Sequence, residues 1–185
     1  AQRTQDDSII IERNLALETL RHPDENMEWV RPFAAFLLEV RPGTLYGNVA
    51  AGSADSGFVL RPQEAMDCSA SLPSVPVAQV NEAVGCMTGL FILRADGDCA
   101  WVHAFRVWKS SHIGVTTADQ KASLRLDSMV ISDNHIGVAL GFHMAYSTME
   151  HRVYGHNLTI YGSTDASTCD ASNECRAISE DAVDG

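Results

Sequence analysis

Two neighbouring stretches of this chain end in the same sequence motif, a short polar corner followed by Ile-Gly-Val. The tripeptide occupies residues 113–115 and again residues 136–138. Before the second one, apolar side chains recur at every other position with one slip, at Leu124, Leu126, Met129 and Ile131. That spacing is the period of a strand with one face in a core. Two strand-and-turn lines of one design, one after the other, are typical of coils in a parallel β-helix.

The length of the repeat can be counted from the glycine that precedes each apolar strand. These glycines are Gly57, Gly89, Gly114, Gly137 and, by the same count, Gly162, with intervals of 32, 25, 23 and 25 residues. A coil of three short strands and three turns needs roughly 20–25 residues. Leucine-rich repeats share that length, but their Leu-x-x-Leu-x-Leu signature is absent. The sequence therefore predicts an all-β, right-handed parallel β-helix.

We expect residues 1–185 to form a single β-helix segment of a larger protein. Proline- and serine-rich residues 61–80 and the poorly alternating residues 141–152 are predicted loop excursions, and residues 164–185 a polar, cysteine-bearing tail. Residues 8–20 allow a helix, but their β-branched run and alternation favour a strand.

Turn chemistry marks the corners of the predicted coils. Arg41–Thr44, which contains Pro and Gly, is predicted to be a turn. Four asparagines each precede an apolar segment and are either ordinary turn residues or a ladder from coil to coil: Asn14, Asn48, Asn81 and Asn134.

Composition excludes several classes of function. The chain is 45% hydrophobic and 20% charged, which fits neither a disordered nor a membrane-spanning protein. The formal net charge of −11 argues against nucleic acid and anionic membranes as partners. No run of 18 apolar residues occurs, so no membrane insertion is expected in this segment.

The five cysteines show no Cys-x-x-Cys pair and no zinc-ligand spacing. Cys68, Cys99 and Cys169 lie in turn-like sequence, which favours disulfides of a secreted protein over reduced thiols. Cys169 and Cys175 bracket a short polar loop and are predicted to pair locally. A second pair is expected among Cys68, Cys86 and Cys99. The sequon at Asn157 is compatible with glycosylation.

Four motifs follow one another along the chain, at residues 48–58, 105–114, 133–138 and 158–163. In this order they resemble a region shared by the fibrocystins and the cell-surface hyaluronidases, over roughly residues 8–170. The Trp-Lys-Ser tripeptide at residues 108–110 is most similar to the corresponding segment of the fibrocystin-like proteins. This resemblance implies a β-helix in a large extracellular or cell-surface protein, including the surface of the ciliary membrane, without an agreed catalytic role.

The hyaluronidase branch implies glycan cleavage instead. Its Asn-x-Ala-His-Ser motif reads Asn-Glu-Ala-Val-Gly at residues 81–85, so the histidine is absent here. A polysaccharide-cutting β-helix would need carboxylates, Arg or His along an outer strand face, with two carboxylates about 5–9.5 Å apart. The candidates for such a catalytic set are Asp127, Asp133, His103 and Arg106, with Asp55 as a further carboxylate.

Histidines recur in the chain, and two of them, His112 and His135, occupy equivalent slots before each Ile-Gly-Val. Stacked imidazoles can bind a metal, but corner histidines are commoner, so no metal site is predicted. No phosphate loop or nucleophile elbow occurs, and no cofactor is predicted. The expected role is a non-catalytic structural or interaction module, whose partners are segments of the same protein or other extracellular proteins and glycans; the alternative is a polysaccharide-acting enzyme.

Overall fold

The computed structural model describes residues 5–19, 33–65, 67–69, 79–95, 97–117, 120–141 and 152–162. Within these ranges the regular elements are strands, and there is no α-helix. Their bounds are β1 Gln5–Glu12, β2 Leu15–Leu17, β3 Ala34–Leu38, β4 Arg41–Tyr46, β5 Val49–Ala51, β6 Ser56–Leu60, β7 Gln63–Ala65, β8 Asn81–Val84, β9 Thr88–Ile92, β10 Cys99–Trp108, β11 Ile113–Thr117, β12 Ser123–Ser132, β13 Ile136–Ala139 and β14 Val153–Ile160.

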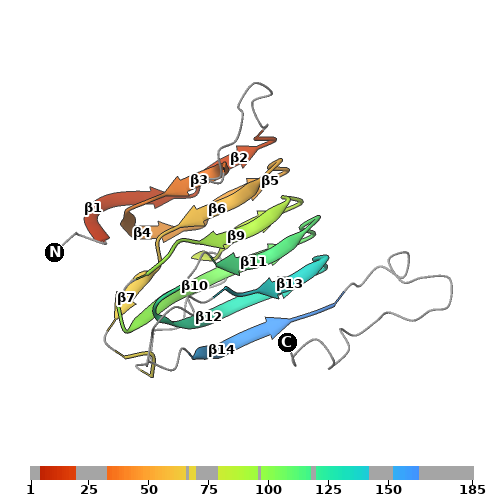
Figure 1. Cartoon of the computed structure of the whole chain (residues 1–185). Coiled ribbons are helices and arrows are strands. Elements are labelled where there is room, and N and C mark those ends of the chain that lie inside the picture. Colours follow the sequence, from red (N-terminus) through yellow and green to blue (C-terminus); the bar gives the residue numbers. More distant parts are fainter. Residues whose placement is uncertain are drawn as a thin grey trace, which may run out of the picture.

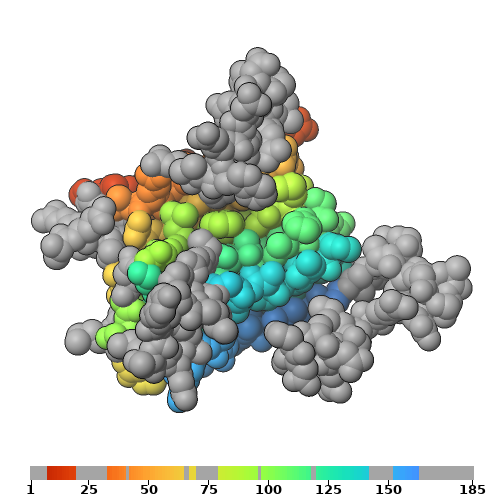
Figure 2. Space-filling model, viewed as in Figure 1, coloured from red at the N-terminus to blue at the C-terminus, as the bar shows by residue number. Residues whose placement is uncertain are grey.

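The strands wind into successive coils that lie one over another (Figure 1). One sheet runs in the order β14-β12-β10-β8-β5-β2, and a second runs β13-β11-β9-β6-β3. Neighbouring strands in both sheets are parallel, and Ile113 lies directly opposite Ile136, as the repeated Ile-Gly-Val motif predicts. The chain is therefore a parallel β-solenoid, and the predicted fold class is confirmed. In the space-filling view the coils appear as adjacent bands in chain order (Figure 2).

A narrow apolar column fills the space between the sheets. Its fully buried side chains include Phe58, Leu90, Val107, Leu126 and Ile131. These residues alternate along their strands with outward-facing ones, so each coil contributes a few side chains to a core shared with its neighbours.

Glycines form a second column, because Gly57, Gly89, Gly114 and Gly137 lie in successive coils of the second sheet. A Cβ on Gly89 would lie 2.1 Å from Val107 Cγ1 and 2.8 Å from the Gly114 carbonyl oxygen. The backbone of the next coil occupies the space that a side chain would take. The predicted repeat is confirmed for these four glycines, but Gly162 is outside the column, and a Cβ added there would have nothing within 4 Å.

The asparagine ladder is present in the first three coils. The Asn14 amide N–H donates to Asn48 Oδ1 at 3.1 Å, and the Asn48 N–H donates to Asn81 Oδ1 at 3.3 Å. Each side-chain amide also donates to the next asparagine or to a nearby carbonyl, so the buried side chains of Asn48 and Asn81 are paired. Asn134 is at a different corner, where its Oδ1 accepts from the Ser110 N–H at 2.9 Å. Its assignment to the ladder is wrong.

One predicted turn is also wrong. Residues 41–44 begin strand β4, which pairs in parallel with β1. Pro42 is the partner of Asp6, directly before the point where the pairing changes register between Asp6 and Ile10. A proline has no N–H to donate, so it is tolerated in a strand at an edge or at such an irregularity.

The excursion at residues 61–80 is partly folded onto the stack. β7 pairs antiparallel with the start of β10, with Ala65 opposite Cys99 and Gln63 opposite Trp101. Of the excursion at residues 141–152 the structure describes Gly141 and Arg152, and the tail at 164–185 is outside the described residues. Of residues 8–20, the structure describes 8–19, and these contain the end of β1 and all of β2 rather than a helix.

Candidate functional site

A connected group of polar and aromatic side chains lies on the outer face of β10, β12 and β14. Ala100 and Val102 of β10 and Leu124 and Leu126 of β12 are in the core. The residues between them therefore point outward. We call the resulting set the outer-face cluster: Trp101, His103, Arg125, Asp127, Tyr154 and His156, which are aligned by strand register in two rows of three.

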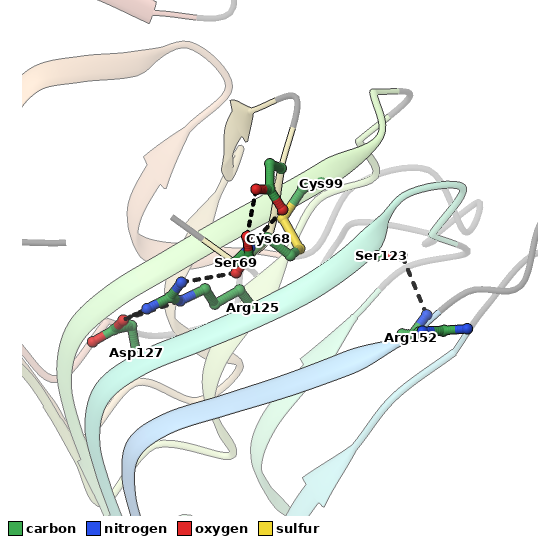
Figure 3. The surroundings of a disulfide bond; sticks show 8 residues. Cys68, Ser69, Cys99, Ser123, Arg125, Asp127 and Arg152 are labelled. Atoms are coloured by element: carbon green, nitrogen blue, oxygen red, sulfur yellow. Dashed lines mark hydrogen bonds and ion pairs between the residues drawn. A yellow bond between two sulfur atoms is a disulfide. The ribbon is translucent and has the colours of Figure 1, made fainter. Parts of the chain in front are cut away.

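Arg125 and Asp127 form a buried ion pair at the centre of this cluster. The Arg125 Nη2 and Nε groups donate to Asp127 Oδ2 at 2.6 Å and 3.1 Å. Arg125 Nη1 also donates to the Cys68 carbonyl oxygen at 2.8 Å, and its guanidinium lies 5.2 Å from the centre of the Trp101 ring. Figure 3 shows Arg125 between Asp127 and the loop that carries Cys68. The arginine thus joins β12 to residues 67–69, which we call the covering loop.

Asp127 has two further partners. Ser128 Oγ donates to Asp127 Oδ1 at 2.8 Å, and His156 Nδ1 lies 3.1 Å from Oδ2. Burial acts to raise the pKa of Asp127, but hydrogen bonds from Ser128, Arg125 and His156 outweigh it, and the pKa is lowered. The carboxylate is therefore held in its charged form, while the His156 side chain is 64% exposed at the edge of the cluster.

The catalytic candidates from the sequence are only partly brought together. His103 and Asp127 are direct register partners on adjacent strands. Arg106 is exposed beyond the left-handed residue Ala104, where β10 bends. Asp133 is at a corner with φ 55°, six residues after Asp127. At ~3.3 Å per residue, this separation is roughly 15–20 Å, well beyond the spacing of a glycosidase pair.

The other candidates lie elsewhere. Asp55 is buried at a corner, where its Oδ2 accepts from the Phe33 N–H at 3.1 Å. His112 and His135 are exposed at neighbouring corners. Within the described ranges, no three His, Cys, Asp or Glu side chains are grouped as metal ligands. Asn157 is exposed in β14, and its side-chain amide donates to Ser128 Oγ at 3.3 Å, so its glycosylation stays a prediction.

Among the residues that the structure describes, a disulfide joins Cys68 and Cys99, with Cα atoms 5.4 Å apart (Figure 3). It holds the covering loop on β10 and packs against Trp101. The predicted pairing among Cys68, Cys86 and Cys99 is confirmed. Cys86 is a buried thiol whose pKa is raised by that burial. Cys169 and Cys175 are outside the described residues, so their predicted bridge stays a prediction.

Reducing the Cys68–Cys99 disulfide is expected to lower the free energy of unfolding by about 3 kcal/mol, because the bond closes a loop between residues 31 apart. Urea unfolding with and without dithiothreitol measures the difference. The Cys68→Ser/Cys99→Ser variant is the matched control, because any change in its midpoint on adding the reductant comes from another bridge, such as the one predicted between Cys169 and Cys175. Equal midpoints for the oxidised and reduced wild type would show that the bond contributes little.

Sequence reasoning missed Arg125 as a member of the site and assigned His156 only to a general set of histidines. The signal for the arginine was the Arg-x-Asp spacing at 125–127, which places both side chains on one face of a strand. That signal alone does not say that His156 lies one coil further on, since this depends on the register of β14 against β12.

Together the stack, the covering loop and the outer-face cluster define a disulfide-bearing parallel β-solenoid protein. Comparisons with protein-family models, with curated proteins and with solved structures give no match. Within the ranges described, there is also no helix whose length and apolar character would let it span a bilayer.

Proposed function

We propose that this chain is a rigid, non-catalytic structural or interaction module of an extracellular, fibrocystin-like protein of the cell surface or ciliary membrane surface. The observation that carries the proposal is the state of the two ends of the stack. Leu15 and Leu17 at one end and Ile160 and Tyr161 at the other are each more than half exposed. Terminal coils of a solenoid need a cover, because their strand edges and apolar side chains otherwise pair without control.

The outer-face cluster supports the same proposal. Arg125 and Asp127 are both buried and bind each other, and Arg125 also binds the Cys68 carbonyl. Because these contacts occupy both side chains, Arg125 and Asp127 join the loop to the coils instead of being available to bind a substrate. The Cys68–Cys99 disulfide favours an oxidising compartment, which agrees with an extracellular location.

A polysaccharide-acting enzyme is the second candidate, and one observation favours it. His156 lies 3.1 Å from the buried carboxylate of Asp127, on the same face as Trp101 and Tyr154. A carboxylate that orients a histidine is a common arrangement for general acid–base catalysis, and aromatic rings are suitable surfaces for sugars. Its substrate would be an extended polysaccharide lying across the strands.

Incubating the purified, disulfide-bonded chain with hyaluronan separates the two candidates. The structural module is expected to leave the polymer length unchanged over a long incubation, as measured by gel electrophoresis. Shortening of the polymer by the wild type would overturn the non-catalytic proposal. If shortening occurs, Asp127→Asn and Asp133→Asn variants test the enzyme: unchanged turnover in both would exclude these carboxylates as its catalytic groups.

A further inference from the structure

The last described strand leaves one end of the solenoid open. β14 pairs with β12 on one side and is the final strand of its sheet. Ile160 stands at the end of the internal column that runs through Ala50, Ala83, Val107 and Ile131, yet it is 52% exposed. The side chain is thus in a core position that no coil of the described residues covers.

The first coil leaves a matching open end. β2 pairs with β5 and is the other final strand of the same sheet. Ala16 is opposite Ala50 and begins the same internal column that Ile160 ends. Leu15 and Leu17 on either side of it are 62% and 61% exposed.

The two ends also share a backbone register. Arg13 and Asn157 both adopt left-handed conformations, with φ 52° and 48°, as do Gly47, Ala104 and Ser128 at the equivalent corner. Asn14 follows Arg13 as Leu158 follows Asn157. If the first coil of another copy were added to β14 in the same register, its Asn14 would therefore lie opposite Leu158 and its Leu15 opposite Thr159.

The hydrogen bonds of the asparagine ladder specify how such a coil would attach. The Asn14 N–H donates toward Asn48 Oδ1, and the Asn14 carbonyl accepts from the Val49 N–H. By register, the N–H and carbonyl of Leu158 project in the same direction, away from β12. The Oδ1 of an Asn14 placed there is the acceptor that the ladder provides for the Leu158 N–H.

Charge agrees with this register. Residue 156 is equivalent to residue 12, so His156 would face Glu12 of the added coil. Residues 152–162 contain Arg152 and His156 but no carboxylate, whereas residues 12–18 contain Glu12 and Glu18 with Arg13. A basic edge therefore meets an edge with two carboxylates, which favours this pairing over two β14 edges meeting each other.

We propose that the β14 edge of one copy of this chain docks, in parallel and head to tail, on the β1–β2 edge of a second copy. This inference deepens the proposed function, on which it rests, by naming a second copy as the partner that covers the ends. The contact is heterologous, so it does not close on itself and each added copy presents a new open edge. Association should therefore continue beyond the dimer as concentration rises.

Sedimentation velocity of the full disulfide-bonded chain over a hundred-fold concentration range tests the proposal. The wild type should form dimers and longer species. Ile160→Lys and Leu15→Lys each destroy one edge and should both be monomeric alone. Mixed in equal amounts, they should form a dimer of doubled mass that does not grow, because only one intact β14 edge then meets one intact β2 edge. Ser111→Lys adds the same charge at an exposed corner of a middle coil and should associate like the wild type.

A register test does not depend on how these lysine variants fold. Thr159→Cys in one copy and Leu15→Cys in another should form an intermolecular disulfide, whereas Thr159→Cys with Leu17→Cys should not, because their Cα atoms would be too far apart. A wild type that stays monomeric throughout, a lysine variant that still dimerises alone, or a mixture that does not dimerise would overturn the proposal. The hyaluronan experiment measures cleavage and not association, so its result tests the proposed module function independently of this docking proposal.

Discussion

Replacing Gly89 with alanine is expected to lower the free energy of unfolding by about 3 kcal/mol or more, because the added methyl group overpacks a core that cannot move aside. Its Cβ would meet the side chain of Val107 and the carbonyl oxygen of Gly114. Val107 is fully buried, and the Gly114 carbonyl belongs to the backbone of the next coil. Relief therefore requires two coils to separate, which weakens their shared hydrogen bonds.

Gly141→Ala is the matched control, since its Cβ would have an ordinary contact of 3.6 Å with the Thr117 carbonyl oxygen. Urea unfolding followed by circular dichroism should show a large fall in midpoint for Gly89→Ala and little change for Gly141→Ala. Similar midpoints for Gly89→Ala and the wild type would mean that the coils adjust more easily than their spacing indicates.

Removing the carboxylate of Asp127 is the second change with a large expected effect. Asp127→Ala should cost about 3–5 kcal/mol, because it leaves the buried Arg125 guanidinium without its counter-charge. The double variant Arg125→Met/Asp127→Ala should be more stable than Asp127→Ala, since no uncompensated charge remains. Thermal or urea unfolding of the three proteins measures this. A double variant less stable than the single one would show that the Arg125 contact with Cys68 matters more than the ion pair.

The same carboxylate makes stability depend on pH. Because the pKa of Asp127 is lowered in the folded protein, its contribution is fully present above the ordinary aspartate pKa, about 3.9, and is lost as the pH falls through the lower folded value. Wild-type stability should therefore fall in this acidic range more steeply than that of Arg125→Met/Asp127→Ala. Parallel unfolding curves for the two proteins between about pH 5 and pH 2 would contradict this assignment.

The sequence was sufficient for the coil architecture because its determinants are local and repeated. Ile113 and Ile136 begin two identical Ile-Gly-Val tripeptides, and the glycine intervals match the length of a coil, so equivalent residues can be aligned from the sequence alone. The ladder of Asn14, Asn48 and Asn81 follows from the same alignment. Gly162 and Asn134 were assigned by residue type, without the alternation around them, and both lie in other columns.

The candidate site depended on information that the repeat does not contain. Asp127 and His103 could be named because they alternate with apolar neighbours, but His156, which contacts Asp127, comes from a later coil, and Arg125, its ion-pair partner, is also bound by the loop of Cys68. How that loop returns to β10 depends on β7 and the disulfide, which follow no repeat. Arg41–Thr44 was misassigned because Pro and Gly usually mark turns, whereas the irregular pairing with β1 accommodates them in a strand.

The glycines at positions 57, 89 and 114 also restrict how a protein of this kind can change over generations. At each of them an added Cβ would meet a carbonyl oxygen of the next coil, so a bulkier residue there disturbs two coils at once. Corners and excursions carry no such restriction. New loops, altered lengths and new binding specificities are therefore expected to accumulate at the corners and excursions, while the column of glycines keeps its spacing.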